Sequence, residues 1–262
     1  MRPRPAYHRS VPRVFAVANQ KGGVAKTTTV HSLGAALAEG GLRVLLVDLD
    51  PQACLTYSLG VVADELGGSL HDVIVHRTPA EHVVTKAGDL HLLPSTIDLA
   101  GAEIYLLSKT GREYALARAI EPLADAYDVV LVDCPPSLGI LTINGLTAAD
   151  EVLIPLQCEG LSHRGVGQLL ETIGDVRSYT NPRLGVAGVV ATMFDGRTRL
   201  AQQVLASIPE TYGLEVLPPP VPKSVKVAEA PSRSRSVLEH APGSAAAAAY
   251  RGLAATIAGR LR

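Results

Sequence analysis

Short runs of apolar residues alternate along the chain with longer stretches in which apolar residues recur at helical spacing. Uninterrupted apolar runs predict strands at residues 14–18, 43–48, 90–93, 129–133, 152–155, 186–192 and 214–217. Helical spacing predicts helices at residues 26–39, 114–123, 165–176 and 200–208, and a final helix within residues 243–261. Strands without polar alternation are buried on both faces, and strands that alternate with helices are joined by right-handed crossovers. The pattern therefore predicts an α/β, doubly wound fold whose mostly parallel sheet is flanked by helices.

The first residues of the chain differ from the rest in composition. They include Arg2, Arg4, Arg9 and Arg13, together with three prolines and no acidic residue. We interpret residues 1–13 as a flexible basic tail, which either has no role or makes an auxiliary contact to DNA or to a partner. Residues 14–262 contain no internal repeat and no shift in composition that would mark a second domain. The sequence therefore predicts a single domain behind a short tail.

The strongest chemical signal lies between the first predicted strand and the first predicted helix. This segment reads Gln20-Lys21-Gly22-Gly23-Val24-Ala25-Lys26-Thr27-Thr28. Consecutive backbone N–H groups in a tight loop bind anions, and the N-terminus of the following helix adds a partial positive charge. Gly22 and Gly23 lack side chains that would hold the backbone away from phosphates. We expect residues 21–28 to bind ATP, with Lys26 reaching the β- and γ-phosphates and the Thr27 hydroxyl holding Mg²⁺.

The loop departs from the standard phosphate-binding pattern G-x-x-x-x-G-K-[ST] at two positions. Gln20 and Ala25 occupy the places of its two glycines. The segment instead matches the deviant form K-G-G-x-x-K-T, in which Lys21 is an additional lysine near the start of the loop. Alanine at position 25 requires a negative φ angle and no phosphate oxygen in the space of its Cβ atom. We expect both conditions to hold, with some risk to nucleotide affinity.

Carboxylates follow two of the predicted strands. Asp48 and Asp50 come at the end of the strand at residues 43–48, and Asp133 ends the strand at residues 129–133. Ligands of α/β folds bind at the carboxyl ends of parallel strands. An acidic side chain there can bind Mg²⁺ directly or through water, or position the water that attacks a phosphate. One such aspartate alone would be interpreted as a turn or cap residue, but three beside a phosphate loop favour a catalytic site.

Composition and charge bear on DNA binding, on membrane association and on the state of the cysteines. The chain has 262 residues, 47% of them hydrophobic and 19% charged, and a formal net charge of −1. Any DNA binding must therefore come from a local basic patch. No apolar run reaches the roughly 18 residues of a membrane span, and no apolar signal segment follows the N-terminal arginines. Cys54, Cys134 and Cys158 form no C-x-x-C pair, so we expect buried, reduced thiols in a cytoplasmic protein.

Taken together, these motifs resemble the ParA (Soj-like) branch of the deviant Walker P-loop ATPases, whose other members include MinD and the nitrogenase iron protein. The resemblance runs from Val14 nearly to the C-terminus. It also includes the segments at residues 192–198 and 225–232 and the pair Ala249-Tyr250. It implies an ATPase that is slow alone, uses ATP and Mg²⁺, and forms an ATP-sandwich homodimer.

The resemblance also implies roles for individual residues. Lys21 matches the signature lysine that crosses to the partner's nucleotide, which would explain a second lysine in the loop. Gly22 would lie where the two loops approach each other. Asp50 is similar to the aspartate that orients the hydrolytic water. The expected catalytic residues are therefore Lys21, Lys26 and Asp50.

Metal and adenine positions follow from the same resemblance. The magnesium shell would include Asp48 and Asp133 in addition to Thr27. The adenine would lie near Pro222 and Lys223, in the loop that follows a cluster of prolines.

A basic segment begins at residue 197. From there to the end, the sequence has nine basic residues and four acidic ones. Family members bind DNA without sequence preference through this region, and only as ATP-bound dimers. The corresponding candidates here are Arg197, Arg199, Lys223, Lys226 and Arg233. The alternative is a solvated charged face. Phosphate contacts would depend strongly on salt, and the absence of tryptophan argues against recognition by base stacking.

The family pairs such ATPases with a DNA-bound protein, ParB, that stimulates hydrolysis, which implies a role in chromosome or plasmid partition on the nucleoid. Related ATPases position other cargo there, and the sequence leaves the cargo open. A MinD-like membrane regulator is less favoured, because the alanine-rich C-terminal helix lacks Phe and Trp. An iron–sulfur redox ATPase is also less favoured, because it would need cysteines that bind the cluster and we interpret Cys134 as a core residue. A DNA-bound regulator that uses ATP only as a switch also stays open.

Overall fold

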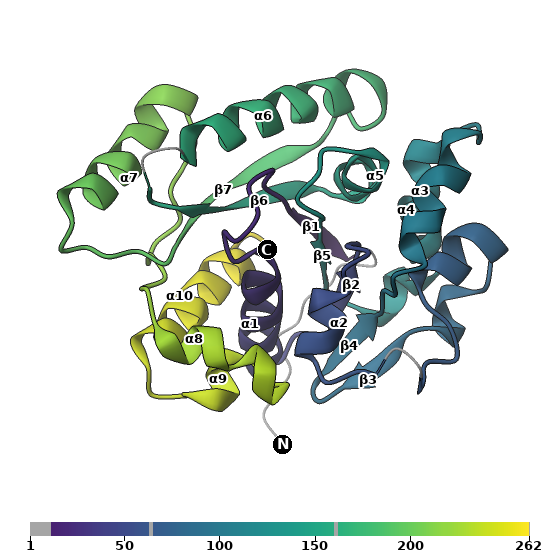
Figure 1. The fold of residues 1–262 in the computed structure, drawn as a ribbon, viewed down its shortest axis with the longest axis horizontal. Coiled ribbons are helices and arrows are strands. Elements are labelled where there is room, and N and C mark those ends of the chain that lie inside the picture. Colours follow the sequence, from purple (N-terminus) through teal and green to yellow (C-terminus); the bar gives the residue numbers. More distant parts are fainter. Residues whose placement is uncertain (1–11, 63–64, 160–161, 262) are drawn as a thin grey trace.

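The computed structural model describes residues 12–62, 65–159 and 162–261, and a seven-stranded sheet lies at its centre (Figure 1). The strands are β1 (Arg13–Val17), β2 (Val44–Asp48), β3 (Thr85–Ala87), β4 (Leu90–Leu93), β5 (Val129–Asp133), β6 (Glu151–Gln157) and β7 (Gly185–Thr192). Their order across the sheet is β3-β4-β2-β5-β1-β6-β7. Neighbouring strands are parallel except β3 and β4, which are antiparallel at one edge. The predicted mostly parallel sheet is confirmed.

Helices cover both faces of this sheet (Figure 1). One face is covered by α1 (Lys26–Glu39), α9 (Val237–His240) and α10 (Ala245–Gly259), and the other by α3 (Leu99–Leu107), α4 (Ala115–Ile120), α5 (Ile140–Ala148), α6 (Ser162–Tyr179) and α7 (Arg199–Tyr212). Alternate strand residues point to opposite faces. In β1, Phe15 and Val17 pack with the first group of helices, and Val14 and Ala16 with the second. Because both faces are buried, the doubly wound prediction is confirmed.

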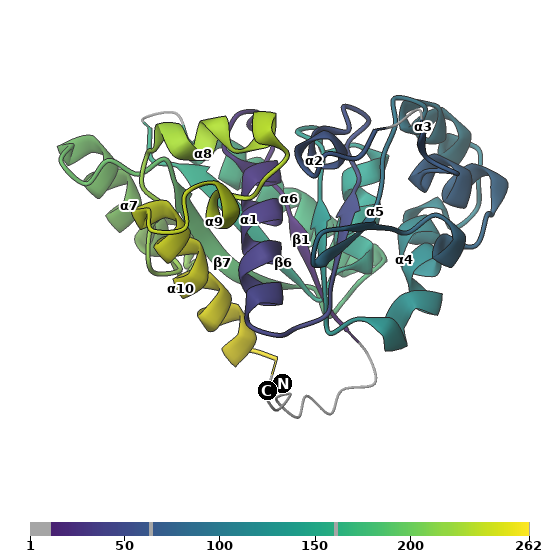
Figure 2. The same ribbon diagram turned by 90° about the horizontal axis from the view of Figure 1, so that it is seen from below.

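Two short helices lie at the edge of the sheet where the parallel strands end. They are α2 (Cys54–Ser58) and α8 (Val225–Glu229). Figure 2 shows both of them beside the N-terminal end of α1. Ligands of α/β folds bind at this edge.

Two predicted elements are wrong. Residues 214–217 form no strand but a single bridge between Val216 and Val189, because the prolines after Leu217 have no N–H group to extend the pairing. The helix predicted at residues 114–123 is replaced by α4 between two 3₁₀ turns, at Arg112–Tyr114 and Glu121–Ala126. Further irregular turns occupy Asp72–His76 (π-helical), Ala80–His82 and Pro231–Arg233.

Arg13 belongs to the folded body and not to the predicted tail. It is the first residue of β1, and its guanidinium forms ion pairs with Asp150 (3.6 Å) and Glu151 (3.3 Å). Residues 1–11 of the predicted tail lie outside the described residues. Among the described residues, no helix combines the length and apolar character that crossing a membrane requires.

Candidate nucleotide-binding site

The predicted phosphate loop joins β1 to α1 and is anchored to two other strands. The Asn19 side chain donates from Nδ2 to the Pro155 carbonyl of β6 (2.7 Å), and its Oδ1 accepts a hydrogen bond from the Lys21 N–H (3.0 Å). Val24 is fully buried, and its carbonyl accepts a hydrogen bond from the Thr192 hydroxyl at the end of β7 (3.0 Å). The loop is therefore held against the carboxyl ends of the parallel strands.

A cavity of about 860 Å³ opens beside this loop. Its walls come from the loop, from α2 and from residues 221–225 at the start of α8. The predicted site residues that line it are Gly22, Gly23, Ala25, Lys26, Thr27, Thr28, Asp50, Pro222 and Lys223. Lys21 and Val24 are not among its lining residues, and Asp48 and Asp133 are buried behind it. The volume suits a ligand as large as a nucleotide.

Lys26 brings a buried cation to this cavity. Only 8% of the residue is exposed, and its Nζ donates to the Lys21 carbonyl at 3.4 Å. Burial lowers the pKa of Lys26, and the carboxylate of Asp133 opposes that shift. A desolvated ammonium group with one distant acceptor favours a negatively charged ligand such as phosphate.

Asp133 ends β5 with a carboxylate whose two oxygens have no hydrogen-bond partner at bonding distance among the described residues. Burial raises the pKa of Asp133 well above its usual value and Asp48 raises it further, whereas the nearby Thr27 hydroxyl and Lys26 lower it. Two orphaned oxygens beside a phosphate-loop hydroxyl suit a hydrated Mg²⁺, which binds carboxylates and keeps several waters. Asp133 and Thr27 therefore fit a magnesium ion.

Asp48 is already engaged within the chain. Its Oδ2 accepts hydrogen bonds from the Thr56 N–H (2.8 Å) and hydroxyl (2.7 Å), and its Oδ1 accepts from the Asp50 N–H (3.3 Å). Burial raises the pKa of Asp48 to about 6, although these hydrogen bonds oppose the shift. The same Thr56 hydroxyl accepts from the Ser95 N–H (3.0 Å). Asp48 thus holds α2 and the Asp50 loop at the end of β2, Thr56 links α2 to the segment after β4, and the role of Asp48 in the magnesium shell stays a prediction.

Asp50 lines the cavity and is only half-buried. Its Oδ1 accepts a hydrogen bond from the Gln52 N–H (2.9 Å), which holds the carboxylate in a turn. The second oxygen can still accept a hydrogen bond from water. This placement allows the predicted positioning of a hydrolytic water.

The donor set fits a magnesium nucleotide as a whole. When bound, the ion would neutralise charge on the β- and γ-phosphate oxygens. Lys26 and the loop N–H groups would hold the phosphates, Thr27 and Asp133 would hold the hydrated ion, and Asp50 would orient water. The residues that carry these proposed roles come from β1, β2, β5 and α1, and meet because those strands are neighbours in the sheet.

Ala25 contradicts the sequence prediction. Its φ angle is 64° and its ψ angle is 37°, a left-handed conformation, whereas we predicted a negative φ. The residue before α1 takes this conformation because the loop must reverse direction into the helix. An L-residue in this region is strained by about 1–2 kcal/mol, since its Cβ atom crowds the carbonyl oxygen.

Replacing Ala25 with glycine is expected to raise the free energy of unfolding by up to about 1 kcal/mol. Relief of the left-handed strain exceeds the entropy that glycine adds to the unfolded chain. Urea denaturation measures the difference. Ala53, left-handed with a φ angle of 51° before α2, is the matched control. Ala53→Gly should give a similar gain in stability. A loss of stability in Ala25→Gly would contradict the conclusion that the left-handed backbone of Ala25 is strained.

Lys21 and Gly22 stand at the outer side of the loop. The Lys21 ammonium lies 3.7 Å from Glu159 Oε2, and 36% of its side chain is exposed. A Cβ atom built at Gly22 would meet no other atom within 4 Å, and Gly22 is not among the left-handed glycines. Nothing in the described part of the chain therefore requires glycine at this position.

The basic residues predicted to bind DNA are all exposed. They are Arg197, Arg199, Lys223, Lys226 and Arg233. Arg197 forms an ion pair with Asp195 (2.9 Å), and Lys226 forms one with Glu229 (3.0 Å). Both pairs lie in solvent, which screens their attraction, so phosphates can compete for both cations.

Sequence reasoning missed the residues that brace the loop. Asn19 and Thr192 were recognisable in principle, because each follows or ends a predicted parallel strand at the ligand-binding edge. No local signal ties Thr56 to Asp48. Cys54 was predicted to be buried and is exposed at the start of α2, whereas Cys134 and Cys158 are buried as predicted.

Comparisons with known proteins agree with this geometry. A family model described as an AAA domain matches residues 12–186. Soj of Bacillus subtilis, a sporulation initiation inhibitor protein, is 42% identical over 248 residues, which cover 94% of this chain and 98% of that protein. The chromosome-partitioning ATPase Soj of Thermus thermophilus is 46% identical over 254 residues, covering 97% and 98%. A crystal structure of cobyrinic acid a,c-diamide synthase from Mycobacterium smegmatis, with bound ATP analog and magnesium, is 51% identical, covers 95% of each chain and has a TM-score of 0.85.

Proposed function

The chain belongs to the Soj/ParA family of P-loop ATPases, and on that premise we propose that it partitions chromosomes or plasmids by gripping DNA as an ATP-bound dimer. As a member of this family it is an ATPase that uses ATP and Mg²⁺. The observation that carries the proposal is the second lysine of the loop. Lys26 already supplies the buried cation of this nucleotide site, while the Lys21 ammonium lies beside Glu159. Lys21 is therefore available to a nucleotide held by a second copy.

The open space at Gly22 supports the same dimer. Since no atom within the described chain crowds a Cβ atom there, a glycine is useful mainly where another backbone approaches closely. Two copies that face each other across their phosphate loops would meet at this position. In that arrangement Lys21 would stabilise charge that develops on the partner's transferring phosphoryl group.

DNA binding would use cations at the ligand-binding edge. Lys223 lines the nucleotide cavity, Lys226 lies on α8 and Arg233 ends the 3₁₀ turn after it. Because the cavity and these cations share one segment, closing the dimer over ATP can order the segment for phosphate contacts. We propose that hydrolysis, stimulated by a ParB-like partner, releases the DNA. The protein would then act in the cytoplasm, on the nucleoid.

Nucleotide-dependent DNA binding tests this proposal. We expect nonspecific duplex DNA to bind in a non-hydrolysable ATP analogue and not in ADP, and binding to weaken at least about tenfold between about 50 and 200 mM salt. Gly22→Val is the matched control, because a Cβ atom at this position meets no other atom in one chain, whereas a valine side chain would obstruct a second loop. It should keep ADP binding and lose DNA binding. Equal DNA binding in ATP analogue and ADP, or in Gly22→Val, would contradict the dimer model.

Amide synthesis is a second candidate function, favoured by the 51% identity to the structure from Mycobacterium smegmatis that carries the synthase name. Such a reaction would use the same nucleotide site to activate a carboxylate for attack by ammonia. Incubation with cobyrinic acid, ammonia and Mg-ATP, followed by mass spectrometry, separates the two functions. Amide products that depend on Lys26 would favour the synthase, and ATP consumption without them would favour partition.

A further inference from the structure

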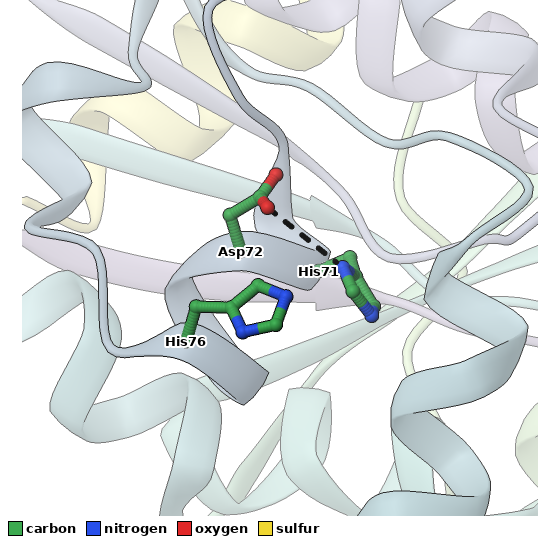
Figure 3. A group of neighbouring side chains, drawn as sticks. All are labelled: His71, Asp72 and His76. Carbon is green, nitrogen blue, oxygen red and sulfur yellow. Dashed lines mark ion pairs between the residues drawn. The ribbon is translucent and has the colours of Figure 1, made fainter.

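Two histidines lie close together in a region that the nucleotide site does not use. His71 directly precedes the π-helical turn Asp72–His76, and His76 is its last residue. In an α-helix, residues five apart point about 140° away from each other, whereas the wider π turn brings the fifth residue back towards the same side. The imidazole centroids are 5.3 Å apart, at an interplanar angle of 79°. Figure 3 shows both rings beside each other, with the Asp72 carboxylate above them.

Ser69, three residues before Asp72, holds the Asp72 carboxylate in place. Its Oδ2 accepts hydrogen bonds from the Ser69 N–H (2.8 Å) and hydroxyl (3.2 Å). Ser69 is itself buried, and its hydroxyl lies 3.4 Å from the Thr96 hydroxyl. The remaining oxygen, Oδ1, lies 3.9 Å from His71 Nδ1. One acceptor oxygen is thus fixed and presented to the histidines.

The separations are close to those of a metal site. One ligand atom from each of His71, Asp72 and His76 can be chosen so that all three lie within 4.8 Å of one another. In a tetrahedral zinc site with bonds of about 2.0–2.2 Å, ligand atoms lie about 3.4 Å apart and two imidazole centroids lie about 5 Å apart. His76 is exposed and His71 is half-buried, so their rings can rotate. Such a rotation can bring the ligand atoms from their present separation to that of a zinc site. Within the described residues, neither ring has a hydrogen-bond partner that would oppose this rotation.

We propose that His71, Asp72 and His76 bind a divalent transition-metal ion, with zinc as the best match, at a site separate from the Mg²⁺ nucleotide site. Two imidazoles and a carboxylate suit zinc, and water can complete the tetrahedron. The hydrogen bonds from Ser69 to Asp72 supply the outer-shell support that metal-ligating carboxylates have. The site is independent of the proposed partition function.

Calorimetric titration of the untagged full chain with zinc chloride tests the site. A large excess of Mg²⁺ over zinc competes for the oxygen ligands of the nucleotide cavity, and nucleotide is left out of the titration because ADP itself binds zinc. We expect about one zinc ion per chain, with affinity at least about tenfold weaker in His71→Ala and in His76→Ala. His82→Ala is the matched control, since His82 is an exposed histidine on the next turn of the chain and should leave the affinity unchanged. Cys54→Ser should also retain binding, which separates this site from the exposed thiol.

The variants must first bind ADP as the parent protein does, which shows that they are folded. An absence of zinc binding in the parent protein would overturn the proposal. So would equal affinity in the parent, His71→Ala and His76→Ala proteins, or a loss of affinity in His82→Ala of the same size.

Discussion

Replacing Lys26 with alanine should abolish nucleotide binding. The ammonium group is buried beside the cavity, and among the described residues its one hydrogen bond is the long contact to the Lys21 carbonyl, so it can turn to the β- and γ-phosphates. Charge-assisted hydrogen bonds contribute about 1.5–3 kcal/mol each, so loss of contacts to two phosphates weakens binding about a hundredfold or more. Titration with a fluorescent ATP analogue in Mg²⁺ measures the loss.

Lys21→Ala is the matched control for this prediction. Both lysines lie in the same loop, but Lys21 is not among the residues that line the cavity of its own chain, and its ammonium lies beside Glu159. Lys21→Ala should therefore bind ADP nearly as well as the parent protein and fail to dimerise in ATP. Thermal unfolding must show that Lys26→Ala is folded, because the change removes the cation near buried Asp133. Normal ADP binding by a folded Lys26→Ala protein would contradict the assigned role.

The phosphate loop was predictable because its chemistry is local. Glycines, lysines and a hydroxyl must follow one another along the backbone to surround phosphates, and a strand must precede them and a helix follow. The aspartates at the ends of β2 and β5 were predictable for a related reason, since parallel strands place their carboxyl ends together. The conformation of Ala25 was not predictable, because closure of the loop sets its φ angle and overrides the preference of alanine.

Side-chain partners depended on contacts that sequence does not display. Asp48 was expected to face magnesium, yet Thr56 from α2 occupies one of its oxygens. The excess of basic residues from position 197 onward leaves out the acidic residues elsewhere in the chain that form ion pairs with them. Asp195 lies just before it, and Glu39 pairs with Arg251 from far along the chain. Charge counts along a sequence therefore overstate the cations that are open to DNA.

The elements that failed were those with weak or interrupted patterns. Pro122 lies in the predicted helix at residues 114–123, where its ring favours the start of a new turn over continuation of the helix. The helices α3 and α5 were not predicted at all, although both pack on the sheet. Both are apolar around much of their circumference, so their sequences lack the periodic contrast that marks an amphipathic helix.

Replacing Asp50 with alanine should trap the ATP-bound dimer. The Asp50 side chain accepts a hydrogen bond from the Gln52 N–H, while its own N–H bonds to Asp48, so the change spares the Asp48–Thr56 contacts that fix α2. If the Asp50 carboxylate orients the hydrolytic water as proposed, phosphate release should fall at least about a hundredfold without it. Binding of ATP should persist, because Lys26 and the loop N–H groups are untouched. Light scattering in ATP and in ADP, with a phosphate-release assay, measures both effects.

Asp50→Asn separates the charge of Asp50 from its turn. The amide oxygen can still accept from the Gln52 N–H, so a fall in turnover equal to that of Asp50→Ala would assign the effect to the charge. The double variant Lys21→Ala with Asp50→Ala should be monomeric in ATP, because it lacks the lysine that we propose reaches the partner's nucleotide. A monomeric Asp50→Ala protein in ATP would count against the sandwich dimer. A dimer that survives in the double variant would leave the dimer standing and remove Lys21 from its interface.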